Sequence, residues 1–80
     1  MKLILIIVPP DAANRLIDLL IEHEFRATRI DSVGGFLKKG NSSVAVGVAE
    51  EYVEEAVKLI RASATHANVF VLNVARYERL

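Results

Sequence analysis

The chain has 80 residues, no cysteine and two histidines, and its ten basic and ten acidic side chains cancel to a formal charge of zero. A chain this short buries a small core, and a domain without disulfides or a structural metal often gains the missing stability by oligomerising. The balanced charge argues against a polynucleotide partner, because nonspecific nucleic-acid binding needs a cationic surface. We therefore expect one domain over residues 1–80.

The first predicted element is a strand, because the β-branched run Leu3–Val8 ends at two prolines. The run is too short for the hydrophobic segment of a secretory signal or for a membrane span, so we expect a cytoplasmic protein without membrane insertion. An amphipathic helix is predicted from Pro10 to about His23, since apolar residues recur there at intervals of three and four. Its apolar stripe is expected to lie on a sheet.

Two strands and the loop between them come next. The segment Phe25–Val33 alternates imperfectly and ends at a glycine pair, and Gly34–Asn41 (GGFLKKGN) is predicted to be a loop. The following strand alternates strictly, with Val44, Val46 and Val48 on one side and Ser43, Ala45 and Gly47 on the other. One face of this strand is bulky and the other is nearly bare.

A second amphipathic helix over Glu50–Ser63 and a last strand over Val69–Val74 complete the pattern. Strand–helix–strand twice over is the βαββαβ order of ferredoxin-like α+β folds, which have a four-stranded antiparallel sheet. Right-handed crossovers place both helices on one face of that sheet and leave the other face uncovered.

The uncovered face is expected to be apolar, because the first and last strands carry apolar residues at both alternating positions. An exposed apolar sheet face marks an interface, so we infer self-association over this face. On this argument, a charge placed at Val71 breaks the assembly or unfolds the subunit.

The loop Gly34–Asn41 is the first candidate for a binding site. Its glycines let backbone N–H groups approach a ligand, its lysines offset phosphate charge, and Phe36 and Leu37 are apolar where loops are normally polar. These properties suit a nucleotide, although no GK[ST] sequence follows as it would in a P-loop. A hairpin whose Phe36 fills a subunit interface is an equal alternative.

The neighbouring strands offer a second candidate region. The bare positions of the strand ending at Val48 admit either a ligand or another backbone. Arg26 and Thr28 place donors on one side of the preceding strand, where they suit a phosphate or a base edge. Without further information, a strand arginine is more often a solvated surface charge.

No catalytic or metal-binding constellation is visible in the sequence. His23 and His66 have no acidic or cysteine ligands at metal spacing, and the serines have no paired base. We therefore predict a protein that is not an enzyme and that uses neither a metal nor a cofactor.

Several of these segments resemble one known family. FRATR from Phe25, VGGFLKKGN from Val33 and VGV from Val46, with MKLI at the start and NRL from Asn14, closely resemble the PII-like cyclic di-AMP receptor family. The resemblance covers nearly the whole chain. It implies a homotrimer of ferredoxin-like subunits that binds cyclic di-AMP between neighbours and signals to a downstream protein, which the sequence does not identify.

The resemblance also implies which residues contact the ligand. Arg26 and Thr28 would reach phosphate and adenine, and Gly47 would leave room for the base. The other contacts that it implies are the backbone of Gly35, Phe36 and Leu37, the polar Asn41, the last-strand aromatic Phe70, and the tail residues Tyr77 and Arg79. Arg79 stands where the family has a glutamine, and it can stack on the adenine or pair with phosphate instead.

Three departures from the family pattern leave alternatives open. Glu24 stands where the family has Asn or Gly, and its carboxylate would repel a nearby phosphate. The connection Arg61–Asn68 replaces a long family loop, and Arg79 replaces the glutamine. These departures favour, as alternatives, a PII-like structural or interaction trimer that has lost the ligand, or a pocket for another adenine nucleotide.

Overall fold

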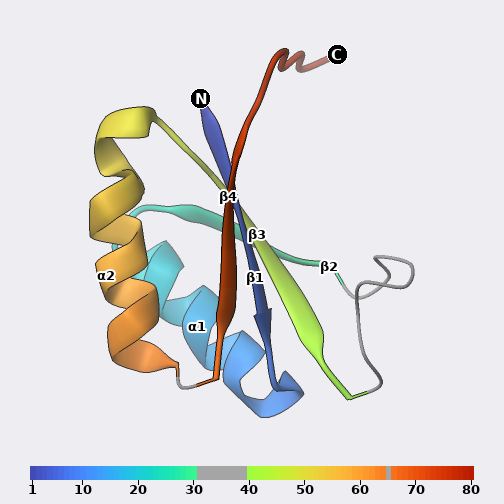
Figure 1. Cartoon of the computed structure of the whole chain (residues 1–80), viewed down its shortest axis with the longest axis vertical. Helices are drawn as coiled ribbons and strands as arrows, with labels where there is room; N and C mark the ends of the chain where they lie inside the picture. The colour runs from blue at the N-terminus through green and yellow to red at the C-terminus, as the bar shows by residue number, and fades with distance from the viewer. Residues whose placement is uncertain (31–39, 65) are drawn as a thin grey trace.

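The computed structural model describes residues 1–30, 40–64 and 66–80 and contains the expected succession of elements (Figure 1). In chain order these are β1 (Lys2–Val8), α1 (Pro10–Glu22), β2 (Arg26–Ile30), β3 (Ser42–Val48), the 3-10 turn η2 (Glu50–Tyr52), α2 (Val53–Ser63) and β4 (Asn68–Asn73). The predicted second helix thus begins as a 3-10 turn. The last three residues of the predicted strand 25–33, and most of the predicted loop 34–41, lie outside the described residues.

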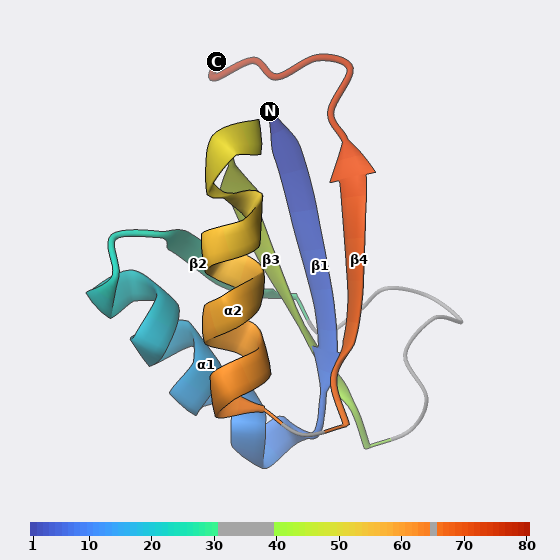
Figure 2. The same ribbon diagram turned by 60° about the vertical axis from the view of Figure 1, so that its left-hand side comes forward.

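The strands form one antiparallel four-stranded sheet in the order β2-β3-β1-β4. Both helices lie on the same face of this sheet, as Figure 2 shows. This arrangement confirms the predicted ferredoxin-like α+β fold, and it follows from two right-handed crossovers that each carry a helix over the sheet.

The core lies between the helices and the sheet face that they cover. Ile4 and Ile6 of β1 and Val44 and Val46 of β3 are fully buried there. The helices contribute the apolar stripes that the spacing predicts, namely Ala13, Leu16 and Leu20 of α1 and Ala56 and Ile60 of α2. Full burial of a Leu or Ile side chain contributes roughly 1.5–3 kcal/mol, so this layer supplies most of the driving force for folding.

The end of α1 has a distinct local structure. The N–H of Phe25 donates to the carbonyl of Leu20 at 2.9 Å, and the N–H of Glu24 donates to the carbonyl of Ile21 at 2.9 Å. This is the Schellman pattern, in which the residue after the cap adopts a left-handed conformation, and Glu24 has a φ of 68°. Phe25 packs against the core and so completes the apolar contact that accompanies this motif.

The face of the sheet that the helices do not cover is called the open face here, and the strand register arranges its residues in rows. One row contains Arg26, Gly47, Leu3 and Leu72, and the next contains Thr28, Ala45, Leu5 and Phe70. The half of the face over β1 and β4 is therefore bulky and apolar, whereas the half over β3 is bare and is bordered by the polar side chains of β2.

The register corrects one expectation about β4. Val71 is paired with Ile4, whose side chain is buried under the helices, so Val71 lies on the helix side of the sheet. A charge at Val71 therefore does not probe the open face. Leu72, which is paired with Leu3, lies on the open face and is the appropriate probe.

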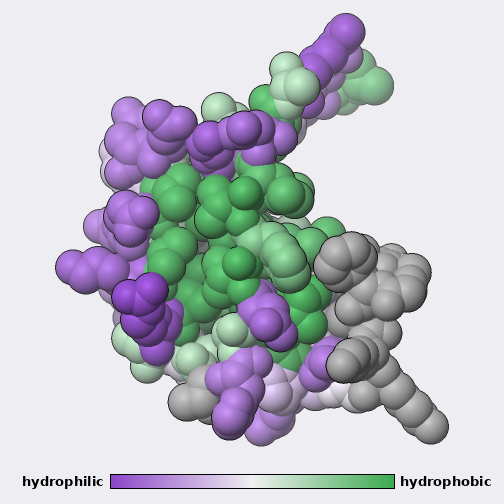
Figure 3. Space-filling view, in the orientation of Figure 1, coloured by the Kyte–Doolittle hydropathy of each residue, from purple (hydrophilic) through white to green (hydrophobic). Residues whose placement is uncertain are grey.

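The edge strand β4 is exposed along its whole length. Val69, Phe70, Val71 and Leu72 retain 37%, 38%, 45% and 45% of their accessible surface. In Figure 3 the green of apolar side chains gathers over this strand, which Figure 1 draws in front. An exposed apolar edge strand is a ready template for pairing with another strand, and β4 has this character between Val69 and Leu72.

Candidate functional site

A hollow of about 1060 Å³ lies at the end of the sheet where the chain begins and where the tail after β4 departs. Figure 2 shows both termini at this end. Four segments surround the hollow: the start of β1, the turn from α1 into β2, the end of β3 with the start of α2, and the tail. It is lined by Met1, Lys2, Leu3, His23, Glu24, Phe25, Arg26, Thr28, Ala45, Gly47, Val48, Ala49, Tyr52, Glu55, Val74 and Tyr77.

Four of the residues named from the sequence line this hollow together: Arg26, Thr28, Gly47 and Tyr77. Arg26 of β2 is paired with Gly47 of β3, so the arginine lies directly beside the position that has no side chain. A Cβ built on Gly47 would meet no atom of the described residues within 4 Å, so none of them fills the space above this backbone. A flat ring can approach the sheet closely at such a position.

The two arginines of β2 have different environments. Arg29 lies on the helix side, where its Nη2 donates to Ser42 Oγ at 2.8 Å and its Nη1 donates to Asn14 Oδ1 at 3.3 Å. Arg26 lies on the open side and lines the hollow, and within the described part of the chain its guanidinium has no hydrogen-bond or ion-pair partner. Its donors are therefore available to a bound anion.

Among the other predicted ligand residues, those that the structure describes do not line the hollow. Asn41 precedes β3, whereas Gly47 lies near its far end, and this length of strand spans about 20 Å. Phe70 is separated from Thr28 by β1 and β3. Arg79 is exposed in the tail. Gly35, Phe36 and Leu37 lie outside the described residues.

The hollow also includes residues that the sequence analysis did not select. Tyr52, at the end of η2, and Glu55, in the first turn of α2, line it. The sequence offers no signal for Tyr52 beyond an aromatic residue near the start of the predicted helix. Its position beside the turn that follows α1 depends on how the helices cross the sheet, and local periodicity does not encode that.

Glu24 is also part of the wall, and its backbone is strained. Together with His66, it is one of two non-glycine residues with positive φ in the described segments. The left-handed conformation costs a residue with a Cβ roughly 1 kcal/mol. Its carboxylate also adds negative charge to a hollow that is proposed to hold phosphate, so the departure noted in the sequence falls within the site.

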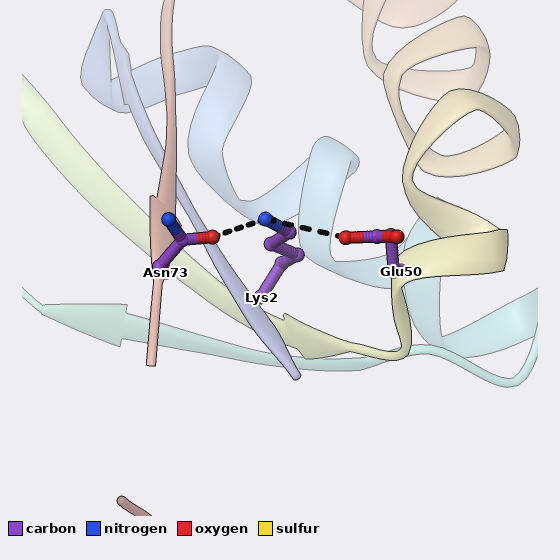
Figure 4. A network of polar contacts seen from close by, with 3 residues as sticks. All are labelled: Lys2, Glu50 and Asn73. Atoms are coloured by element: carbon purple, nitrogen blue, oxygen red, sulfur yellow. Dashed lines mark hydrogen bonds and ion pairs between the residues drawn. The ribbon is translucent and has the colours of Figure 1, made fainter. Parts of the chain in front are cut away.

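Lys2 holds together three segments beside the hollow, as Figure 4 shows. Its Nζ donates to Asn73 Oδ1 of β4 and lies 3.4 Å from Glu50 Oε1 of η2. The N–H of Val74 donates to the carbonyl of Met1 at 3.2 Å, which fixes the point where the tail leaves the sheet. Tyr77 therefore extends from an anchored position, and the Lys2 charge is already engaged by Glu50.

The connection between α2 and β4 is short, as the sequence indicates: α2 ends at Ser63 and β4 begins at Asn68. In the part of the chain that the structure describes, no three His, Asp or Glu side chains are placed to hold a metal ion. None of the described helices is long and apolar enough to span a membrane.

Comparison with known proteins identifies the family and the fold. The family model described as "Cyclic-di-AMP receptor" matches residues 1–80. The crystal structure of a protein of unknown function from Pediococcus pentosaceus superposes with a TM-score of 0.83 at 33% identity, covering 99% of this chain and 96% of that one.

A second solved structure resembles the fold at lower identity. The PII-like protein CutA from Nostoc sp. PCC 7120, in its apo form, superposes with a TM-score of 0.71 at 20% identity, covering 94% of this chain and 82% of that one. At this identity the likeness concerns the fold alone, and it shows that the βαββαβ architecture described above is PII-like. With the family model matching over its whole length, the chain belongs to the cyclic-di-AMP receptor family.

Proposed function

We propose that this chain is a cytoplasmic, non-enzymatic receptor that binds cyclic di-AMP in the hollow, at contacts between the subunits of a homotrimer. One observation carries the proposal. In a chain that belongs to the cyclic-di-AMP receptor family, four residues from three separate segments, Arg26, Thr28, Gly47 and Tyr77, line a single hollow.

The chemistry of the hollow suits a dinucleotide. Its volume of about 1060 Å³ is slightly above the roughly 300–1,000 Å³ that is usual for small-molecule sites. Arg26 offers a planar set of donors to a phosphate, and the Thr28 hydroxyl offers both a donor and an acceptor to phosphate or base. Gly47 leaves room for a ring, and Tyr77 provides an aromatic face on which a base stacks.

The position of Phe70 supports a site that is shared between subunits. Phe70 and Thr28 lie in the same row but are three strand spacings apart, roughly 14 Å at about 4.8 Å per spacing. One base cannot contact both side chains of one subunit over that distance. Phe70 therefore joins the site from a neighbour, whose apolar β4 packs near the hollow, and the backbone of residues 35–37 completes it as the family resemblance implies.

Two features favour a second candidate function. Glu24 places a carboxylate in the wall of the hollow, and the short connection after Ser63 lacks the long loop expected of a receptor that signals to a downstream protein. These features suit a PII-like structural or interaction trimer that has lost the ligand, or one that binds another adenine nucleotide.

Isothermal titration of the purified protein with cyclic di-AMP distinguishes the two candidates. ATP, which keeps the adenine base but lacks the cyclic backbone, and cyclic di-GMP, which keeps the cyclic backbone but has a different base, serve as controls. Saturable binding of about one cyclic di-AMP per subunit, with much weaker binding of the controls, is the expected result. No heat of binding with cyclic di-AMP would reject the receptor function, and tight binding of ATP would identify a changed ligand.

A further inference from the structure

Tyr52 lies in the wall of the hollow without taking part in the core. It is the residue before the first turn of α2, and its N–H donates to the carbonyl of Ala49 at 3.0 Å. The inward residues of this helix, Ala56 and Ile60, are buried, whereas Tyr52 retains 53% of its accessible surface. An aromatic ring that is exposed within a hollow, and is not needed for packing, is available to a ligand.

The charges around the hollow indicate which part of a nucleotide lies near Tyr52. Tyr52, the residue that precedes α2, and Glu55, in the first turn of that helix, both line the hollow. Arg26 and the bare position Gly47 form the sheet side of the same hollow. A phosphate is attracted toward Arg26 and repelled by Glu55, which leaves the Tyr52 side for an uncharged base.

We propose that Tyr52 stacks on a base of the bound nucleotide and forms a second aromatic contact in addition to Tyr77. This inference rests on the proposed function, since it requires a nucleotide in the hollow. A dinucleotide has two bases, and the chain supplies an exposed tyrosine from each of two segments far apart in sequence. Aromatic stacking accepts any base, so Tyr52 contributes affinity, and the polar residues contribute selectivity.

The composition of the chain allows a direct test. There is no tryptophan, and the two tyrosines of the sequence, Tyr52 and Tyr77, both line the hollow. Intrinsic tyrosine emission therefore reports on this site alone. Titrating Tyr77→Phe with cyclic di-AMP monitors Tyr52 by itself, and titrating Tyr52→Phe monitors Tyr77.

We expect saturable quenching of the Tyr52 emission in Tyr77→Phe. We also expect Tyr52→Ala to weaken binding by roughly five- to a hundredfold, and Tyr52→Phe to bind within about twofold of the unmodified chain, because stacking needs the ring and not the hydroxyl. Melting followed by circular dichroism is the folding control. Unchanged Tyr52 emission at saturation, or unchanged affinity of a folded Tyr52→Ala, would overturn the inference while the receptor function stands.

If the unmodified chain does not bind cyclic di-AMP, the proposed function is the one that fails, and the same titration of Tyr77→Phe with ATP decides the role of Tyr52. Quenching by ATP supports stacking on another adenine nucleotide. Constant emission with ATP overturns the inference.

Discussion

The two halves of the open sheet face share the same rows and have opposite character. Over β1 and β4 the positions carry Leu3, Leu5, Phe70 and Leu72, which are bulky and apolar. Over β2 and β3 they carry Arg26, Thr28, Ala45 and Gly47, which are polar or bare. No described helix covers either half, so the side chains themselves determine that one half presents an apolar surface and that the other half, together with Leu3, lines the hollow. A single sheet face can in this way serve both association and ligand binding.

The largest expected effect concerns the apolar half. Leu72→Asp should dissociate the trimer or unfold the subunit, because an unpaired charge buried at an interface costs on the order of 3–5 kcal/mol. Val71→Asp is the matched control: it lies on the same strand with the same exposed fraction of 45%, but on the helix side. Sedimentation velocity should show a trimer for Val71→Asp only. The reverse pattern would place the interface on the helix side of β4.

The next effect concerns the polar half. Arg26→Ala should weaken cyclic di-AMP binding by about 1.5–3 kcal/mol, the usual value for a hydrogen bond to a charged group, and should leave the trimer intact. Arg61→Ala makes the same change in net charge on α2, outside the hollow, and should bind normally in the same calorimetric titration. Equal affinities for the two variants would remove Arg26 from the site.

A substitution at Gly47 should have different effects on the stability of the fold and on ligand affinity. Gly47→Val adds a side chain where the structure has open space, so the free energy of unfolding should stay the same or rise by up to about 1 kcal/mol. Binding should nevertheless weaken by about 1–3 kcal/mol, because the added methyl groups occupy the space of the ligand. Chemical denaturation and calorimetry measure the two quantities. Normal affinity in a stable trimer would mean that no ligand approaches this backbone.

The smallest expected effect is at Glu24. Glu24→Asn should raise the free energy of unfolding by about 0.5–1 kcal/mol, because Asn tolerates the left-handed conformation better than Glu does. It should also tighten binding a few-fold by removing a carboxylate near phosphate. Glu55→Gln removes a carboxylate from the same hollow, at a residue whose φ is not positive. This variant should therefore change the affinity for cyclic di-AMP and leave the thermal stability unchanged. A destabilised Glu24→Asn would show that the carboxylate has a structural role.

The sequence was most informative about elements and least informative about the site. Alternation in Val44–Val48 and the helical spacing around Leu16 are local patterns, and the structure confirms both the elements and their inward faces. For Val71 the alternation did not say which side faces the helices, because both sides of its strand are apolar. Pairing with Ile4 decided that question.

The same distinction applies to the hollow. Arg26, Thr28 and Gly47 were identifiable because a motif and a bare strand face mark them. Tyr52 was not, because nothing local relates the start of α2 to the turn after α1. The two segments meet because α1 ends and α2 begins at the same end of the sheet, the end where β1 starts.

Local sequence patterns predict the order of the elements, the α+β class and the alternation of bulky and bare positions, since each depends on residues that are close in the chain. The register, the side on which each β4 residue lies, and the meeting of Glu24, Arg26, Tyr52 and Tyr77 in one hollow are visible only in the folded chain. Those features arise from pairings between residues far apart in the chain, whose free energies depend on the whole sheet and not on any local segment.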